Sequence, residues 1–226
     1  MKMRKVPITP FFCLLLLLNW ASHSFAGSQE KAFETLQAKM QKIHSYHARF
    51  VQKQWSGADS TSDPDDVQEG QFFFSRPDRF HWIYSKPFHQ EYIADGTTLK
   101  IYDEDLEQGI IRSQKDYPGF MFSYLFMPDD PVWKEYDIEM ETQQHGKTLF
   151  ILTPNKSLQQ PPVQKIRIEF NQSTITMIDI LDAFDQRTLI QFTQSTLNPV
   201  VPDSAFVMQW PEGLEVLDER HDSLHP

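Results

Sequence analysis

The stretch FFFSRPDRFHWIYS, residues 72–85, determines which fold class this chain adopts. In its second half an aromatic residue occupies every other position, at Phe80, Trp82 and Tyr84. A period of two places the three side chains on one face of a β-strand, while Arg79, His81 and Ile83 face the other way. The sequence therefore predicts a strand over residues 78–85 with one aromatic face.

The first half of the same stretch is apolar on both faces. Phe72 and Phe74 share one face of a strand and Phe73 takes the other. Such a strand is buried on both sides, so one interpretation is a core built from large residues. The other is a surface that receives an apolar ligand, and these residues alone leave both interpretations open.

Beyond this stretch, the period of two continues almost to the end of the chain. Turn signals such as Asp95-Gly96 and Asn171-Gln172 separate the short segments. The segments are 98–102, 106–112, 136–141, 148–153, 163–170, 174–180 and 187–193. No second helical pattern is long enough for a parallel crossover, so we expect an antiparallel sheet made of hairpins. About eleven strands in one sheet favour a barrel or a strongly curved half-barrel over a flat sheet.

One helix precedes the strands. Ser28 is a candidate N-cap, and apolar residues then recur at helical spacing. These residues are Phe33, Leu36, Met40 and Ile43. The pattern predicts a helix over residues 29–45 with one apolar stripe.

Two irregular segments interrupt the strands. Residues 56–70 are acidic and rich in turn formers, which predicts a long exposed hairpin loop. Residues 117–133, YPGFMFSYLFMPDDPVW, are densely apolar and bracketed by prolines. This segment is either a lid over an apolar cavity or a plug in a closed barrel. Its candidate cavity residues are Phe120, Phe122 and Phe126.

The first 26 residues have the three parts of a secretory signal peptide. Basic residues up to Lys5 are followed by an apolar run over 11–18 and by small residues at Ser24 and Ala26. The run is shorter than the roughly 20 residues that span a bilayer. We expect cleavage after Ala26, which leaves a single domain over 27–226.

Composition excludes several function classes. Lys and Arg number 21 against 31 Asp and Glu, for a net charge of −10, which argues against nucleic acid as a partner. One cysteine, Cys13, leaves no disulfide or multi-cysteine metal site. No nucleophile elbow, zinc motif or dinucleotide fingerprint is present, so we expect no catalytic residue, cofactor or metal. Aromatic residues make up 13% of the chain, and a proposed function has to account for this high aromatic content.

The order of several short motifs resembles the periplasmic outer-membrane lipoprotein carrier family, LolA. An Arg-Pro-x-x-Phe-x-Trp strand, an Asp-Gly-x-x-Leu hairpin, and then Tyr-Asp and Leu-Glu-Gln follow one another in that family. The corresponding residues here are Arg76-Pro77-Asp78-Arg79-Phe80-His81-Trp82, Asp95-Gly96-Thr97-Thr98-Leu99, Tyr102-Asp103 and Leu106-Glu107-Gln108. The proline-bracketed segment, Trp133, Leu152-Thr153-Pro154 and the closing 211–220 also have counterparts. The resemblance covers nearly the whole chain after the signal peptide.

The resemblance implies an unclosed antiparallel β-barrel covered by a helical lid. Its hydrophobic cavity holds the acyl chains of a lipoprotein, which a monomeric carrier receives from an inner-membrane ABC transporter and delivers to an outer-membrane receptor. By motif position Arg76 is the arginine that holds the lid, and Phe80 and Trp82 line the cavity. With these we group the other aromatic residues of the three densest stretches as cavity residues: Phe72, Phe74, Tyr84, Phe120, Phe122 and Phe126.

The sequence also departs from the family pattern. Lys100 stands where an aromatic residue is common, and the segment 117–133 has more Phe and Tyr than the usual leucine-rich version. These departures leave two alternatives open on the same fold: a carrier of another amphiphile, such as a glycolipid or phospholipid, and a regulator that senses lipoproteins.

Overall fold

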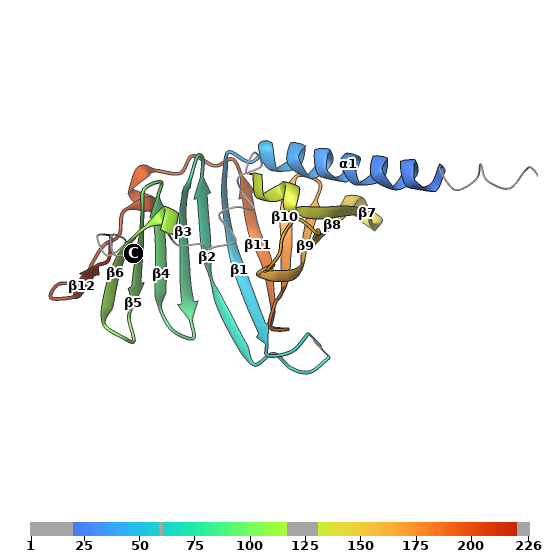
Figure 1. Cartoon of the computed structure of the whole chain (residues 1–226). Helices are drawn as coiled ribbons and strands as arrows, with labels where there is room; N and C mark the ends of the chain where they lie inside the picture. Colours follow the sequence, from blue (N-terminus) through green and yellow to red (C-terminus); the bar gives the residue numbers. More distant parts are fainter. Residues whose placement is uncertain (1–19, 59–60, 117–130, 221–226) are drawn as a thin grey trace, which may run out of the picture.

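The computed structural model describes residues 20–58, 61–116 and 131–220. Within them one α-helix, α1 (Trp20–Gln41), is followed by strands that all join a single sheet (Figure 1). The strands are β1 (Ser45–Trp55), β2 (Asp66–Ser75), β3 (Arg79–Lys86), β4 (Gln90–Asp95), β5 (Thr98–Asp103), β6 (Gln108–Ser113), β7 (Tyr136–Thr142), β8 (Lys147–Pro154), β9 (Val163–Asn171), β10 (Thr174–Asp182), β11 (Arg187–Leu197) and β12 (Glu215–Asp218).

The sheet is open and its strand order is linear. The twelve strands run β12-β6-β5-β4-β3-β2-β1-β11-β10-β9-β8-β7. From β1 to β6 and from β7 to β11 successive strands pair antiparallel as hairpins, and β1 pairs antiparallel with β11. The prediction of an unclosed antiparallel β-structure with a helix is therefore confirmed. One pair departs from it, because β12 runs parallel to β6 at the edge of the sheet. That pairing joins residues about a hundred positions apart, and no local sequence pattern indicates it.

The helix boundaries differ from the prediction. α1 begins at Trp20, so Ser28 lies inside the helix and does not cap it. It ends at Gln41, four residues before the predicted end, although Ile43 is buried with the helical stripe. Asn198 accounts for the early end: its side chain accepts from the backbone N–H of His44 at 2.8 Å and donates to the carbonyl of Lys42 at 2.9 Å. The chain there turns into β1 and leaves the helix.

β1 is the central strand that the sequence prediction missed. Its inner residues alternate, with Tyr46, Ala48 and Phe50 buried and His47 and Arg49 between them, but the row continues into Gln52, which hides the pattern. Because β1 ends at Trp55 and β2 starts at Asp66, the predicted loop over 56–70 is too long at its C-terminal end. β4 was also missed, and the strand predicted over 106–112 begins at Gln108, which leaves Leu106 in an exposed turn.

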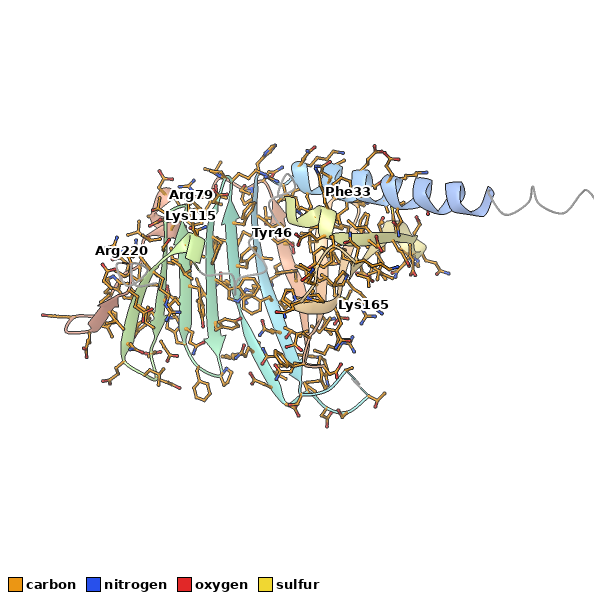
Figure 2. The ribbon with its side chains drawn as sticks, viewed as in Figure 1. Phe33, Tyr46, Arg79, Lys115, Lys165 and Arg220 are labelled. Carbon is orange, nitrogen blue, oxygen red and sulfur yellow. The ribbon has the colours of Figure 1, made fainter. Side chains whose placement is uncertain are left out.

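The two faces of the sheet carry different cores. The inner face is the one that bears Phe50, Phe72 and Trp82 and shares a buried cluster with the α1 residues Leu36 and Met40. The outer face of β3–β5 carries a smaller cluster that includes Ile93, and the segment 201–210 packs over it through Phe206 and Met208. Figure 2 marks Tyr46 close to the α1 end of the sheet and Lys165 farther from it. The predicted alternation in β2 and β3 is thus confirmed, with Phe73 on the outer face.

Candidate functional site

The inner face of the β2–β3 hairpin is a continuous aromatic wall. Phe72 lies opposite Trp82 in the antiparallel register, and Phe74 lies opposite Phe80. All four side chains are at most 4% exposed. Tyr84 is partly buried against the same core. The hairpin therefore brings together five of the predicted cavity residues on one surface.

Neighbouring strands extend this wall on both sides. The ring of Phe50, on β1, lies 4.6 Å from that of Trp82, and the rings of Phe72 and Trp82 are 4.7 Å apart. On the other side Tyr84 meets Tyr92 of β4 edge-on at 6.1 Å. These distances are those of contacting aromatic pairs.

Gly70 explains how Phe50 reaches across β2. It faces inward between Phe50 and Tyr84, whose rings meet edge-on at 5.3 Å. A Cβ atom at this position would lie 1.8 Å from the carbonyl oxygen of Ile83 and 2.7 Å from the ring of Phe50. Only glycine allows β2 to pass so close to β3 while the two rings close over it.

α1 covers part of the inner face with its apolar stripe. Leu36, Met40 and Ile43 are at most 1% exposed and belong to the same buried cluster as the aromatic wall, and Phe33 is partly buried against it. Figure 1 shows α1 lying across one end of the sheet, over the β7–β10 side. The helix is therefore the described element whose displacement uncovers inner-face apolar surface.

Arg76 fastens the C-terminal end of α1 to the sheet. It follows β2 directly, and its guanidinium donates through Nε to the carbonyl of Ile43 at 2.7 Å and through Nη2 to the carbonyl of Met40 at 2.9 Å. Its backbone N–H donates to the carbonyl of His44 at 2.9 Å. The last carbonyls of a helix have no partner within the helix, and an arginine supplies several donors in a fixed geometry. The arginine predicted to hold the lid thus contacts the helix that covers part of the inner face.

Two further side chains hold the same end of α1. Lys39 donates to the carbonyl of Gln172, in the β9–β10 turn, at 2.5 Å and lies over the ring of Phe170 at 5.3 Å. Asn198 binds the helix–strand junction from the end of β11. Neither contact has a periodic or motif signal in the sequence, because both join chain segments more than a hundred residues apart.

The N-terminal half of α1 borders a groove. A cavity of about 270 Å³ lies between the helix and the segment that leads into β7. Its apolar lining residues are Phe33, Trp133, Tyr136 and Ile138, with Gln29, Glu30 and Lys134 completing the wall. The helix is thus hydrogen-bonded to the sheet near its C-terminal end and borders this cavity near its middle.

Burial keeps the phenols of the inner face neutral. Burial raises the pKa of Tyr46 to about 12, although the hydrogen bond to Ser195 opposes this effect. Burial, with a smaller contribution from Tyr92, also raises the pKa of Tyr84. Tyr46 donates to the carbonyl of Ile175 at 2.6 Å and contacts Ser195 Oγ at 2.8 Å, which links β10 to β11. These hydroxyls act as hydrogen-bond donors at physiological pH.

Three predicted cavity residues cannot be placed. Phe120, Phe122 and Phe126 lie outside the described residues, so their predicted place in the lid stays a prediction. The two histidines after α1 lie apart from the wall: His44 precedes β1, and His47 lies in β1 with its ring stacked on Phe73 of the outer face at 4.2 Å. In the described part of the chain no three His, Cys, Asp or Glu side chains gather into a metal site.

Comparison with known proteins agrees with this architecture. Residues 41–209 match the profile of the family described as outer membrane lipoprotein carrier protein LolA. The outer-membrane lipoprotein carrier protein of Ralstonia nicotianae is 31% identical over 208 residues, which are 91% of this chain and 94% of that protein. The protein of the same name from Legionella pneumophila strain Corby is 30% identical over 207 residues, 91% of this chain and 98% of the relative.

A solved structure supports the fold independently. An uncharacterized conserved protein from Thermus thermophilus superposes with a TM-score of 0.50 over 88% of this chain and 99% of its own, at 8% identity. Among the helices of the described residues, none is long and apolar enough to cross a membrane. With the family profile covering β1 to the segment over the outer face, this chain belongs to the outer membrane lipoprotein carrier protein LolA family.

Proposed function

We infer that this protein shields the acyl chains of lipoproteins on its inner face and carries them across the periplasm. The observation that carries the proposal is the position of Arg76 between the aromatic wall and the cover. Its two guanidinium hydrogen bonds hold the end of α1 against the inner face, whose buried core also includes Phe80 and Trp82. A carrier needs such a cover, because an empty aromatic wall of this size would otherwise be exposed to water.

The energetics of loading and release fit a cover held at one end. Removing an acyl chain from water is worth about 0.8 kcal/mol per methylene, so a single chain contributes roughly 10 kcal/mol. Displacing α1 exposes Leu36 and Met40 and breaks the Arg76 contacts, which offsets part of that gain. Closure of α1 then favours release, because the empty protein recovers the helix contacts.

The partners follow from this task. We propose acylated lipoproteins as cargo, an inner-membrane ABC transporter as the donor and an outer-membrane receptor as the acceptor. Cleavage of residues 1–26 would release the carrier into the periplasm, where it acts as a monomer and without catalysis. Such cleavage would leave α1 with residues 27–41, which retain Phe33, Leu36 and Met40.

Purification from the periplasm tests the proposal. The wild-type protein should carry bound lipoprotein, detectable by mass spectrometry. Phe80→Glu should abolish loading, because it places a charge on an apolar surface that is 4% exposed at this position. Phe184→Glu is the matched control. Phe184 is 83% exposed in the β10–β11 turn, so this variant should bind as much lipoprotein as the wild type. Equal amounts of bound lipoprotein in both variants would contradict the proposal.

A further inference from the structure

The aromatic wall ends at a row of polar side chains on the side away from α1. Along β1 the inward-facing residues are Tyr46, Ala48 and Phe50, and the next is Gln52. Along β2 the wall residues give way to Gln68, the direct cross-strand partner of Gln52. Two neighbouring strands therefore change from apolar to amide at the same level.

Hydrogen bonds join these amides to the wall. Gln52 Nε2 donates to Gln68 Oε1 at 3.1 Å, and the hydroxyl of Tyr84 donates to Gln52 Oε1 at 3.2 Å. Gln52 is only 5% exposed, so its amide is built into the inner face. We call Gln52, Gln68 and the Tyr84 hydroxyl the polar floor. Its members fix one another in place, because a buried amide is retained only where its polar atoms are bonded.

The distance from the top of the wall to the polar floor corresponds to the length of an acyl chain. Six residues separate Tyr46 from Gln52, and an antiparallel strand rises about 3.4 Å per residue, so the apolar surface extends for roughly 20 Å. An extended alkyl chain advances about 1.25 Å per carbon, given its bond lengths and angles. A chain of about sixteen carbons therefore spans the wall from the α1 end to the floor.

We propose that the polar floor sets the longest acyl chain that the aromatic half of the inner face accepts, a step that rests on the proposed carrier function. A methylene that passes the floor contacts amide groups and gains little from leaving water. The floor bounds only this half of the sheet. On the other side of β1, the residue opposite Gln52 is Ile190, followed by Ile178 and Ile168 on the next strands, so the apolar surface continues there.

A chain-length series measures the limit directly. Saturated fatty acids of increasing length are competed against a fluorescent fatty acid on the purified wild-type protein. Affinity should rise about fourfold per carbon, from about 0.8 kcal/mol per methylene, and then level off near sixteen carbons. The chain length at which affinity stops rising is called the break. The free energy of opening α1 is the same for every fatty acid, so it shifts all affinities equally and leaves the break unchanged. A series that rises without a break would overturn the proposal.

A floorless variant tests the assignment to these residues. Gln52→Leu, Gln68→Leu and Tyr84→Phe combined remove the three groups that bond to one another in the floor. The next inward pair, Gln54 and Asp66, lies two residues farther, so the break should move by about five carbons. A break that stays at the wild-type length would overturn the proposal.

Two controls separate the possible failures. Gln191→Leu makes the same chemical change on the outer face of β11, opposite Val51, and should keep the wild-type break. A break that moves in this control as well would overturn the assignment to the floor. Wild-type protein that binds no fatty acid and no lipoprotein would refute the carrier function itself. Binding without a break would refute only the floor.

Discussion

At the residue scale, Arg76 joins the end of α1 to the end of β2. The resemblance in sequence predicted that this arginine contacts a lid, and the structure supplies the atoms: its Nε and Nη2 reach two carbonyls at the end of α1. The sequence could not identify those carbonyls, since they belong to residues 33 and 36 positions earlier in the chain.

Arg76→Leu should therefore favour the loaded protein over the empty one. Losing two hydrogen bonds from a charged donor removes about 2–4 kcal/mol from the closed state. Cargo should still load, but transfer to receptor-bearing membranes should slow at least tenfold, measured as lipoprotein released over time. Arg49→Leu, at an exposed outer position of β1, is the control and should transfer normally. Wild-type transfer by Arg76→Leu would contradict the assigned role.

Asp95 stabilises the turn between β4 and β5. Its carboxylate accepts from the backbone and side chains of Thr97 and Thr98 and pairs with Lys100 at 3.2 Å. Burial disfavours its charged form, but the hydrogen bonds from Thr98 and Thr97 outweigh burial and hold its pKa well below the usual value. Gly96, at φ 99°, completes the tight turn that the Asp-Gly pair predicted.

The lowered pKa gives a pH dependence of definite sign. The stabilisation from Asp95 is fully present above the unfolded-state pKa, about 3.9, and is lost as pH falls toward the folded-state pKa. Asp95→Asn should lower the free energy of unfolding by about 1–2 kcal/mol at pH 7, and this difference should shrink below about pH 4. Urea unfolding of both proteins across this range measures it. A difference that grows on acidification would contradict the assignment.

At the element scale, prediction succeeded where one face of a strand is apolar and failed where the decisive contacts are distant. The alternation in β3 is visible because Phe80, Trp82 and Tyr84 place an aromatic residue at every second position. The alternation in β1 is as regular in the structure, but its inner row ends in a buried glutamine, Gln52, which looks like a surface residue in the sequence. The residue that hid the strand is the one that closes the aromatic wall.

The close approach of β2 to β3 at Gly70 can be tested by substitution. Gly70→Ala places a methyl group where the carbonyl of Ile83 and the ring of Phe50 already lie, so the strands must separate or the ring must move. The free energy of unfolding should fall by about 3 kcal/mol or more. Gly57→Ala is the matched control, because nothing lies within 4 Å of a Cβ there, and it should change stability little. Equal unfolding curves for the two variants would contradict the packing described.

At the scale of the whole molecule, the open sheet and the helix differ in how they are held. β1 is paired along its length with both β2 and β11, whereas α1 is fastened to the sheet through Arg76, Lys39 and Asn198 near one end. Sequence patterns predicted the number of strands closely and the presence of the helix. They could not predict which end is fastened, because the three contacts come from the β2–β3 turn, the end of α1 and the end of β11.

This difference predicts where exchange of backbone hydrogens changes on loading. Binding of an acylated peptide should accelerate exchange at the backbone N–H groups of Ile43 and His44, whose hydrogen bonds depend on the closed helix end. Amides in the ladders of β9 and β10 should stay protected, because these strands pair with each other along most of their length. Mass spectrometry of the loaded and empty proteins compares the two regions.

The variant Arg76→Leu tests whether release of the α1 end causes the faster exchange. Without the guanidinium, the empty protein should already exchange at the α1 end nearly as fast as the loaded wild type, and loading should add little. The β9–β10 ladder should be the same in all four samples. If loading instead slowed exchange at Ile43 and His44 while the strands opened, the sheet and not the helix would be the moving part. The inner face would then have to admit acyl chains by widening between strands, and the end of α1 would be a fixed support.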